Sequence, residues 1–136
     1  MSGPLLDRID LQIERPALAY SQLEDGGSES NAAIALRVAS ARERQRLRFL
    51  DDLEHPTNAV MTPSFIAEHC RPGKGGRRLL ERAFDRLGLS ARTLHRLQKV
   101  ARTIADLDGA QKIASEHLAE AMQYRALDRL VADDRL

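Results

Sequence analysis

The sequence predicts an all-α fold, a small helical bundle with an aliphatic core. Hydrophobic residues make up 43% of the 136 residues, whereas aromatic residues make up only 4% and tryptophan is absent. This balance, with abundant Ala, Leu and Arg, is typical of helical bundles rather than β-sandwiches. A second observation is periodic: Leu94, Leu97, Ala101 and Ile104 recur at spacings of three and four, which makes one apolar stripe on a helix.

The N-terminal segment does not fit a helical bundle. From Ile9 to Glu14 apolar and polar residues alternate, as in a half-buried strand. One strand cannot satisfy its own backbone hydrogen bonds. We therefore expect this segment to be left over from the end of a larger α/β domain, and either to pair with a missing part or to be disordered. The stretch from Arg15 to Ser30, rich in Gly, Ser and acidic residues, is typical of a linker.

Capping residues and turns divide the remainder into helices. Ser90 is a good N-cap for the helix with the apolar stripe, and Gly88 closes the helix before it. Thr62 and Pro63 form an N-cap and first-turn pair, and Ser115 is expected to cap the last helix. The predicted helices span residues 31–50, 63–70, 77–87 and 91–107, and a last helix runs from its cap at Ser115 to about Leu127.

The glycine-rich stretch Arg71-Pro-Gly-Lys-Gly-Gly76 is predicted to be a turn. It resembles a phosphate-binding loop only superficially, because no strand precedes it and the pattern Gly-x-x-x-x-Gly-Lys-Ser/Thr is absent. We therefore do not interpret it as a Walker A loop. The helix that follows is expected to bury an apolar face made of Leu80, Ala83, Phe84 and Leu87.

Arg92, Arg96 and Lys99 lie on a different side of the helix from its apolar stripe. Arg92 falls in the first turn, where the partial positive charge of the helix makes a cation unfavourable by about 0.3–1 kcal/mol unless an anion is present. A first-turn arginine beside free N–H groups is a suitable place for a phosphate. From spacing alone, a solvated arginine is the simpler interpretation.

The helix predicted over residues 31–50 is strongly basic and allows two interpretations. Such a face can follow the phosphates of DNA. More commonly it is a solvated face whose aliphatic stems lie on the core, which we favour for the isolated chain. Its arginines are Arg37, Arg42, Arg44, Arg46 and Arg48, against a single internal Glu43.

Catalytic and metal-binding patterns are not recognisable. The four histidines do not form a spaced ligand set with the single cysteine or a carboxylate, and no serine or cysteine has a base motif. A formal net charge of +1 gives no global attraction to nucleic acid. No apolar run is long enough to cross a membrane, and the lone Cys70 suits a reducing compartment, so a cytoplasmic location is expected. The chain alone is not expected to be an enzyme.

Two blocks resemble the C-terminal lid of magnesium-chelatase-like AAA+ ATPases, in particular their bacterial competence-linked branch. The blocks are GLSARTLHRLQKVARTIADL, residues 88–107, and HLAEAMQYR, residues 117–125; VARTIADL is the most specific part. The resemblance implies an AAA+ lid-type bundle. In that family the arginine of Ser-x-Arg is the sensor-2 residue, which reaches the nucleotide phosphates from the lid, and it maps onto Arg92.

The N-terminal stretch LLDRID, residues 5–10, resembles the Leu-Leu-Asp-Arg-(Phe/Ile)-Asp stretch that ends the AAA+ core in this family. The arginine there is proposed to be an arginine finger that acts in the ATP site of the neighbouring subunit, and it maps onto Arg8. It would neutralise charge developing on the γ-phosphate. From the residues alone, a local pair with Asp7 or Asp10 is the simpler interpretation.

The resemblance also implies a domain plan and a parent activity. Residues 1–29 would be the tail of the AAA+ core and a partly disordered linker, 30–129 the helical lid, and 130–136 a frayed tail. The parent would use ATP and Mg²⁺, assemble into a homo-oligomer such as a hexameric ring, and remodel DNA by branch migration in natural transformation. Partners would be its own core domain and DNA, with no membrane; the fragment itself is not expected to bind a cofactor tightly.

Three alternatives stay open. The parent could be a true magnesium chelatase subunit, which inserts Mg²⁺ into protoporphyrin. Residues 80–97 also resemble a helix-turn-helix, with Gly88 in the turn, although the apolar stripe continues past a usual recognition helix to Ile104. The domain could finally serve only as an oligomerisation or interaction module.

Overall fold

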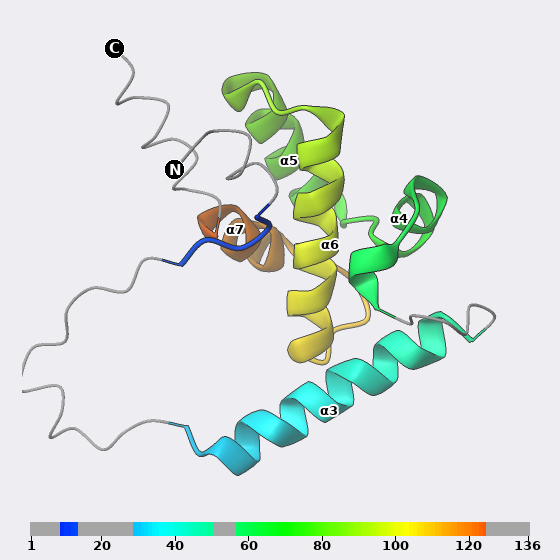
Figure 1. The fold of residues 1–136 in the computed structure, drawn as a ribbon. Helices are drawn as coiled ribbons and strands as arrows, with labels where there is room; N and C mark the ends of the chain where they lie inside the picture. The colour runs from blue at the N-terminus through cyan, green and yellow to red at the C-terminus, as the bar shows by residue number, and fades with distance from the viewer. Residues whose placement is uncertain (1–8, 14–28, 51–56, 125–136) are drawn as a thin grey trace, which may run out of the picture.

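The computed structural model describes residues 9–13, 29–50 and 57–124, and these ranges contain helices and no strand. In order they are α3 (Asn31–Arg48), the 3-10 helix η1 (Asn58–Val60), α4 (Pro63–His69), α5 (Lys74–Leu87), α6 (Ala91–Leu107) and α7 (Ser115–Gln123). Figure 1 shows α6 at the centre, with α7 and α4 beside it and α3 near its C-terminal end. The predicted all-α fold class is confirmed. No described helix has the length and apolar character needed to cross a bilayer.

Most of the predicted helix ends are confirmed by their capping hydrogen bonds. Ser90 Oγ accepts from the Thr93 amide at 3.1 Å at the start of α6. Gly88 ends α5 in the left-handed region, at φ 57°, where glycine has no side-chain penalty. The prediction that Ser115 caps α7 was wrong. Ser115 is the first helical residue, and the cap is Ala114, whose amide donates to His117 Nδ1 at 2.9 Å.

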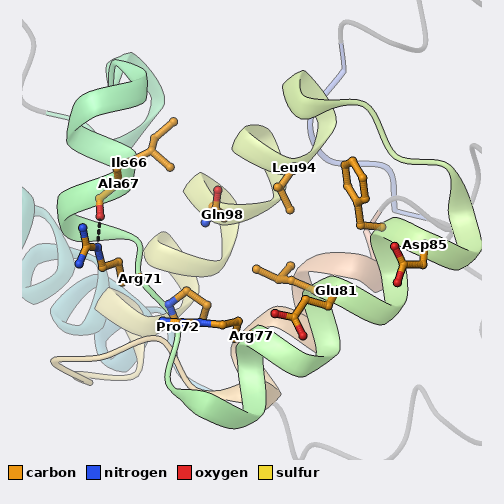
Figure 2. A pocket seen from close by; sticks show the side chains of 11 residues that line it. Ile66, Ala67, Arg71, Pro72, Arg77, Glu81, Asp85, Leu94 and Gln98 are labelled. Carbon is orange, nitrogen blue, oxygen red and sulfur yellow. Dashed lines mark hydrogen bonds between the residues drawn. The ribbon is translucent and has the colours of Figure 1, made fainter.

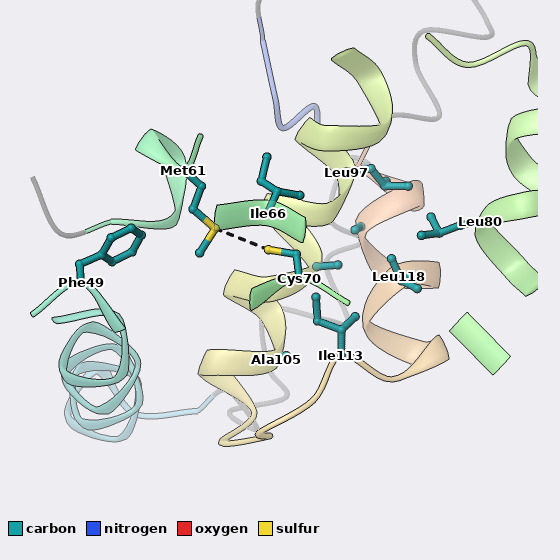
Figure 3. Close-up of a cluster of buried hydrophobic side chains, with 11 residues drawn as sticks. Phe49, Met61, Ile66, Cys70, Leu80, Leu97, Ala105, Ile113 and Leu118 are labelled. Atoms are coloured by element: carbon teal, nitrogen blue, oxygen red, sulfur yellow. Dashed lines mark hydrogen bonds between the residues drawn. The ribbon is translucent and has the colours of Figure 1, made fainter. Parts of the chain in front are cut away.

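The core is built around the apolar stripe of α6 (Figure 3). Leu97, Ala101 and Ala105 are buried, and Leu94 and Ile104 are partly buried at the edges. The two alanines give α7 room to approach α6 closely. Contacting groups from the other segments are Phe49, Met61, Ile66, Cys70, Leu80, Ile113, Leu118 and Ala121. The predicted stripe is therefore the centre of the core.

A buried carboxylate near the C-terminal end of α6 joins three elements. Arg48, the last residue of α3, donates to both oxygens of Asp106 at 2.6 and 2.8 Å. Asn58 of η1 donates to Asp106 at 2.9 Å and accepts from Arg48 at 2.7 Å. Burial raises the pKa of this carboxyl, but the hydrogen bonds from Arg48 and Asn58 and the nearby positive charges outweigh burial. The pKa of Asp106 therefore lies below its ordinary value.

Arg102, one turn before Asp106, extends this network to the start of α7. Its Nη2 lies 3.1 Å from Asp106 Oδ1. The same guanidinium donates to the carbonyls of Ala110 and Gln111 at 2.7 and 2.9 Å. Both carbonyls lie in the connection between α6 and α7, so the network also fixes where α7 begins. We call Arg48, Asn58, Arg102 and Asp106 the buried network.

The first turn of α5 lies where the sequence predicted a turn. The helix begins at Lys74 rather than at Arg77. Gly76 lies within the first turn of the helix because a side chain does not fit there: a Cβ on Gly76 would lie 2.8 Å from both Leu118 Cδ1 and Pro72 Cβ. A glycine here signals contact between α5 and α7, not a break in the helix. The adjacent Gly73 amide donates to the Ile113 carbonyl at 3.3 Å, which secures this end of α5.

The described part of the N-terminal segment, residues 9–13, does not form the predicted strand. It runs as an irregular segment, and the Gln12 amide donates to the Tyr124 carbonyl at the end of α7, at 2.9 Å. One backbone amide is thus satisfied by a helix end instead of a neighbouring strand. Glu14, the last residue of the predicted strand, lies outside the described ranges.

Helix α3 extends beyond the rest of the fold. All residues from Asn31 to Ser40 are exposed, including Leu36 at 74%. Burial begins only at Ala41 and Gln45, where α3 reaches the core. The first half of α3 therefore has no packing within the described part of the chain (Figure 1).

Gly76→Ala is expected to lower the free energy of unfolding by about 1–3 kcal/mol, because the added methyl group overlaps α7 and Pro72. The matched control is Gly75→Ala, whose Cβ would meet only Ser115 Oγ at 3.8 Å. Helix propensity should make that variant more stable by roughly 0.5–1 kcal/mol. Urea unfolding of both variants tests this, and equal effects would contradict the close approach.

Asp106→Asn is expected to destabilise the fold by about 3–5 kcal/mol, because Arg48 and Arg102 would lose their buried counter-charge. Since the folded-state pKa is depressed, the stabilisation from Asp106 is complete above the ordinary aspartate pKa. It is lost as pH falls through the lower folded value. Urea unfolding between pH 7 and acidic pH should show a shallower pH dependence in the variant. A pH dependence identical to that of the unsubstituted chain would refute this role.

Candidate phosphate-binding site

Arg92 lies exposed in the first turn of α6 and lines a cavity of about 600 Å³. The cavity lies between α6, the start of α4 and the N-terminal segment. Its lining residues are Asp10, Met61, Pro63, Ile66, Arg92, His95, Arg96 and Lys99. In the ranges that the structure describes, the Arg92 guanidinium has no carboxylate partner. The sequence thus correctly placed Arg92 on a different side of α6 from the core.

The other two cations predicted for this side of α6 are engaged by protein groups. Lys99 Nζ donates to the Ala59 carbonyl at 2.8 Å, which ties α6 to η1. Arg96 forms an ion pair with Asp10 through its Nε, and its side chain is only 13% exposed. These contacts hold the walls of the cavity in place. Arg92 differs from both because it presents an exposed guanidinium to the cavity.

The donor set of this cavity suits an anion. Positions 92, 95, 96 and 99 follow helical spacing, so one face of α6 supplies all four nitrogen-bearing side chains. A planar guanidinium can bind two phosphate oxygens at once, and its charge strengthens both hydrogen bonds. Asp10 is the single carboxylate among the lining residues. This arrangement offers hydrogen-bond donors for phosphate rather than oxygen ligands for a metal ion.

Arg8, the second residue for which the sequence suggested a role, lies outside the described residues. Asp10, one of the two local partners considered for Arg8, pairs with Arg96. The role suggested for Arg8 therefore stays a prediction.

Three of the five arginines of α3 pair with carboxylates of the described residues. Arg37 pairs with Glu29 at 2.7 Å and Arg46 with Glu43 at 2.8 Å, both on the exposed surface. Arg48 belongs to the buried network. Spacing could not separate Arg48 from its neighbours, because its partner Asp106 is 58 positions away. These pairs favour the solvated-face interpretation of this helix.

A second, mainly apolar cavity of about 490 Å³ lies between α4, α5 and α6 (Figure 2). The prediction that Phe84 is buried was wrong, because Phe84 lines this cavity and is 43% exposed. Leu80 and Ala83 are buried as predicted. The side chain of Leu87 lies outside the description. The full lining is Ile66, Ala67, Arg71, Pro72, Arg77, Leu80, Glu81, Phe84, Asp85, Leu94 and Gln98. Here α5 and α6 diverge, which sequence periodicity does not reveal.

Cys70 is a core residue. It is fully buried, and its thiol donates to the Met61 sulfur at 3.5 Å. Burial raises the pKa of this thiol to about 11, and the nearby Arg102 and Arg48 charges oppose that change only in part. Among the described residues no three His, Cys, Asp or Glu side chains are grouped to hold a metal ion.

Comparison with known proteins gives a consistent result. Residues 28–125 match the family model described as "Magnesium chelatase, subunit ChlI C-terminal". Competence protein ComM of Haemophilus influenzae is 42% identical over 133 residues, which cover 96% of this chain and 25% of that protein. YifB of Escherichia coli is 41% identical over 135 residues, with the same coverage, and Rv2897c of Mycobacterium tuberculosis is 33% identical over 125 residues, covering 92% and 25%. The chain spans about a quarter of the length of these relatives.

Cys70 is expected to resist thiol reagents at pH 8 in the folded chain, because it is buried and its pKa of about 11 keeps the thiol protonated. Mass spectrometry after brief treatment with iodoacetamide should find no adduct until urea unfolds the chain. Rapid labelling under native conditions would show that this part of the core opens.

Proposed function

Since the chain belongs to the magnesium chelatase ChlI C-terminal family, we propose that it is the helical lid of an AAA+ ATPase and that Arg92 is its sensor-2 residue. The observation that carries the proposal is that Arg92 is exposed and lines a cavity together with His95, Arg96 and Lys99. A residue that senses phosphate must be accessible before the nucleotide arrives and must sit on a rigid support. Both conditions hold for Arg92.

The rigid support comes from the opposite end of the same helix. Arg48 and Arg102 fix the C-terminal end of α6 at Asp106, and Lys99 fixes its middle at Ala59. A phosphate that binds and shifts Arg92 would therefore move α6 together with the helices attached to it. In this way binding and hydrolysis at a site in the core domain would be converted into lid movement.

ATP and Mg²⁺ would be the cofactors of the longer protein. The lid residues fit the polyphosphate part, because Arg92 can bind and orient phosphate oxygens and neutralise charge that develops on them. Mg²⁺ prefers oxygen ligands, and the single lining carboxylate, Asp10, is paired with Arg96. The ion, which supplies further charge neutralisation when bound, would take its ligands from the nucleotide and the core.

For the longer protein we propose remodelling of DNA, such as branch migration in natural transformation, by a ring of identical subunits. Support comes from the 42% identity to a protein named for competence. In that ring Arg8 would act as the arginine finger in the neighbouring ATP site. Insertion of Mg²⁺ into protoporphyrin is the alternative suggested by the family description.

A helix-turn-helix role receives less support. The two helices of such a motif pack on each other, whereas α5 packs mainly on α7. A cavity separates α5 from α6 where Phe84 and Leu94 face it. The candidate recognition helix, α6, is also the central helix of the core, with Leu97 and Ala101 buried.

Arg92→Ala is expected to lower the ATP turnover of the longer protein, ATPase core included, by about tenfold or more, because a charge-assisted contact to phosphate is lost. Arg92→Lys should restore part of the rate. The control Arg86→Ala removes another exposed arginine, in the last turn of α5, and should leave turnover unchanged. Normal turnover in Arg92→Ala would exclude the sensor role and favour a purely structural interaction module.

A further inference from the structure

The cavity beside Arg92 already contains an anion, the carboxylate of Asp10. It lines the cavity and forms an ion pair with Arg96, one helical turn from Arg92. We propose that Asp10 is a built-in competitor of phosphate at this site, so that polyphosphate binds α6 only as the Asp10–Arg96 pair gives way. This inference rests on the proposed function of Arg92 and assigns a regulatory role to a residue outside α6.

The position of Asp10 suits such a competitor because Asp10 is not part of the core. Its side chain is 55% exposed, and it lies on the irregular segment 9–13 rather than on a helix. Among the described contacts, a backbone hydrogen bond from Gln12 to Tyr124 attaches this segment separately. The carboxylate is therefore kept at the cavity by its backbone, but it can leave Arg96 without disturbing the buried network.

Spacing makes simultaneous occupancy unfavourable. Side chains at positions i and i+4 of a helix are neighbours, so a phosphate bound by Arg92 also comes close to Arg96 and to the carboxylate paired with it. The phosphate and the Asp10 carboxylate would then repel each other, and this repulsion is stronger in a partly enclosed cavity than in bulk water. Asp10 thus weakens phosphate binding while it is in place, and phosphate weakens the Asp10–Arg96 pair in return.

Phosphate can displace the Asp10 carboxylate from Arg96. Asp10 is the more exposed partner of this pair, at 55% against 13% for Arg96, so a phosphate with several charges can compete from the solvent side with a single carboxylate. Loss of the Asp10 contact would release one attachment of residues 9–13 to α6.

The test is titration of the 136-residue chain with inorganic tripolyphosphate at constant ionic strength, followed by NMR chemical shifts of α6 amides. Asp10→Asn removes the charge and keeps the size of the side chain, and it should bind roughly three- to tenfold more tightly than the unsubstituted chain. The matched control Asp85→Asn makes the same change on the exposed face of α5, outside this cavity. It should bind like the unsubstituted chain.

Each outcome decides the matter. Tighter binding by Asp10→Asn alone supports competition. Equal affinity of Asp10→Asn and Asp85→Asn, or no detectable binding by Asp10→Asn, would overturn it. Failure of the competition proposal can be told apart from failure of the sensor role. The first is tested by tripolyphosphate affinity and the second by the ATP turnover of Arg92→Ala. If Arg92→Ala lowers turnover while Asp10→Asn leaves affinity unchanged, Arg92 keeps its role and Asp10 is only a structural contact.

Discussion

The charge of Asp106 is the constraint on which the arrangement of this domain depends. A carboxylate that is 1% exposed needs partners that replace its hydration, and it obtains them from α3, η1 and α6 itself. Arg48 and Arg102 depend on Asp106 in turn, because burying either guanidinium without this carboxylate would be costly. The apolar core could tolerate several helix orientations, whereas this set of charge-assisted hydrogen bonds requires one geometry.

The two ends of α6 consequently have different tasks. The C-terminal end is fixed by charges that satisfy one another, and the N-terminal end carries cations that face a cavity. Leu97, Ala101 and Ala105 between them are buried in the core. The buried network at the C-terminal end therefore sets where the exposed Arg92 at the other end of α6 lies relative to the bundle.

The sequence predicted what depends on neighbouring residues and missed what depends on distant ones. The stripe of α6 and the caps at Ser90 and Thr62 are local patterns, and they were found. The sequence predicts a turn at Gly76 because Leu118, whose side chain leaves no room for a Cβ there, lies 42 positions further along the chain. Arg48 was grouped with surface arginines for the same reason. Of the candidate site, periodicity gave the side of the helix on which Arg92 lies, but neither the cavity nor the pairing of Asp10 with Arg96.

The exposed first half of α3 has a consequence for the solution behaviour of the domain. The ten exposed residues of this half gain no stabilisation from burial, so their helicity depends on continuation from the packed half of α3, on the Ser30 cap and on the Arg37–Glu29 pair. Its backbone amides will exchange with deuterium far sooner than those around Gln45, which is buried. Ile34, Leu36 and Val38 also leave apolar surface in contact with water along this half, so the part of α3 that opens first carries much of its exposed apolar surface.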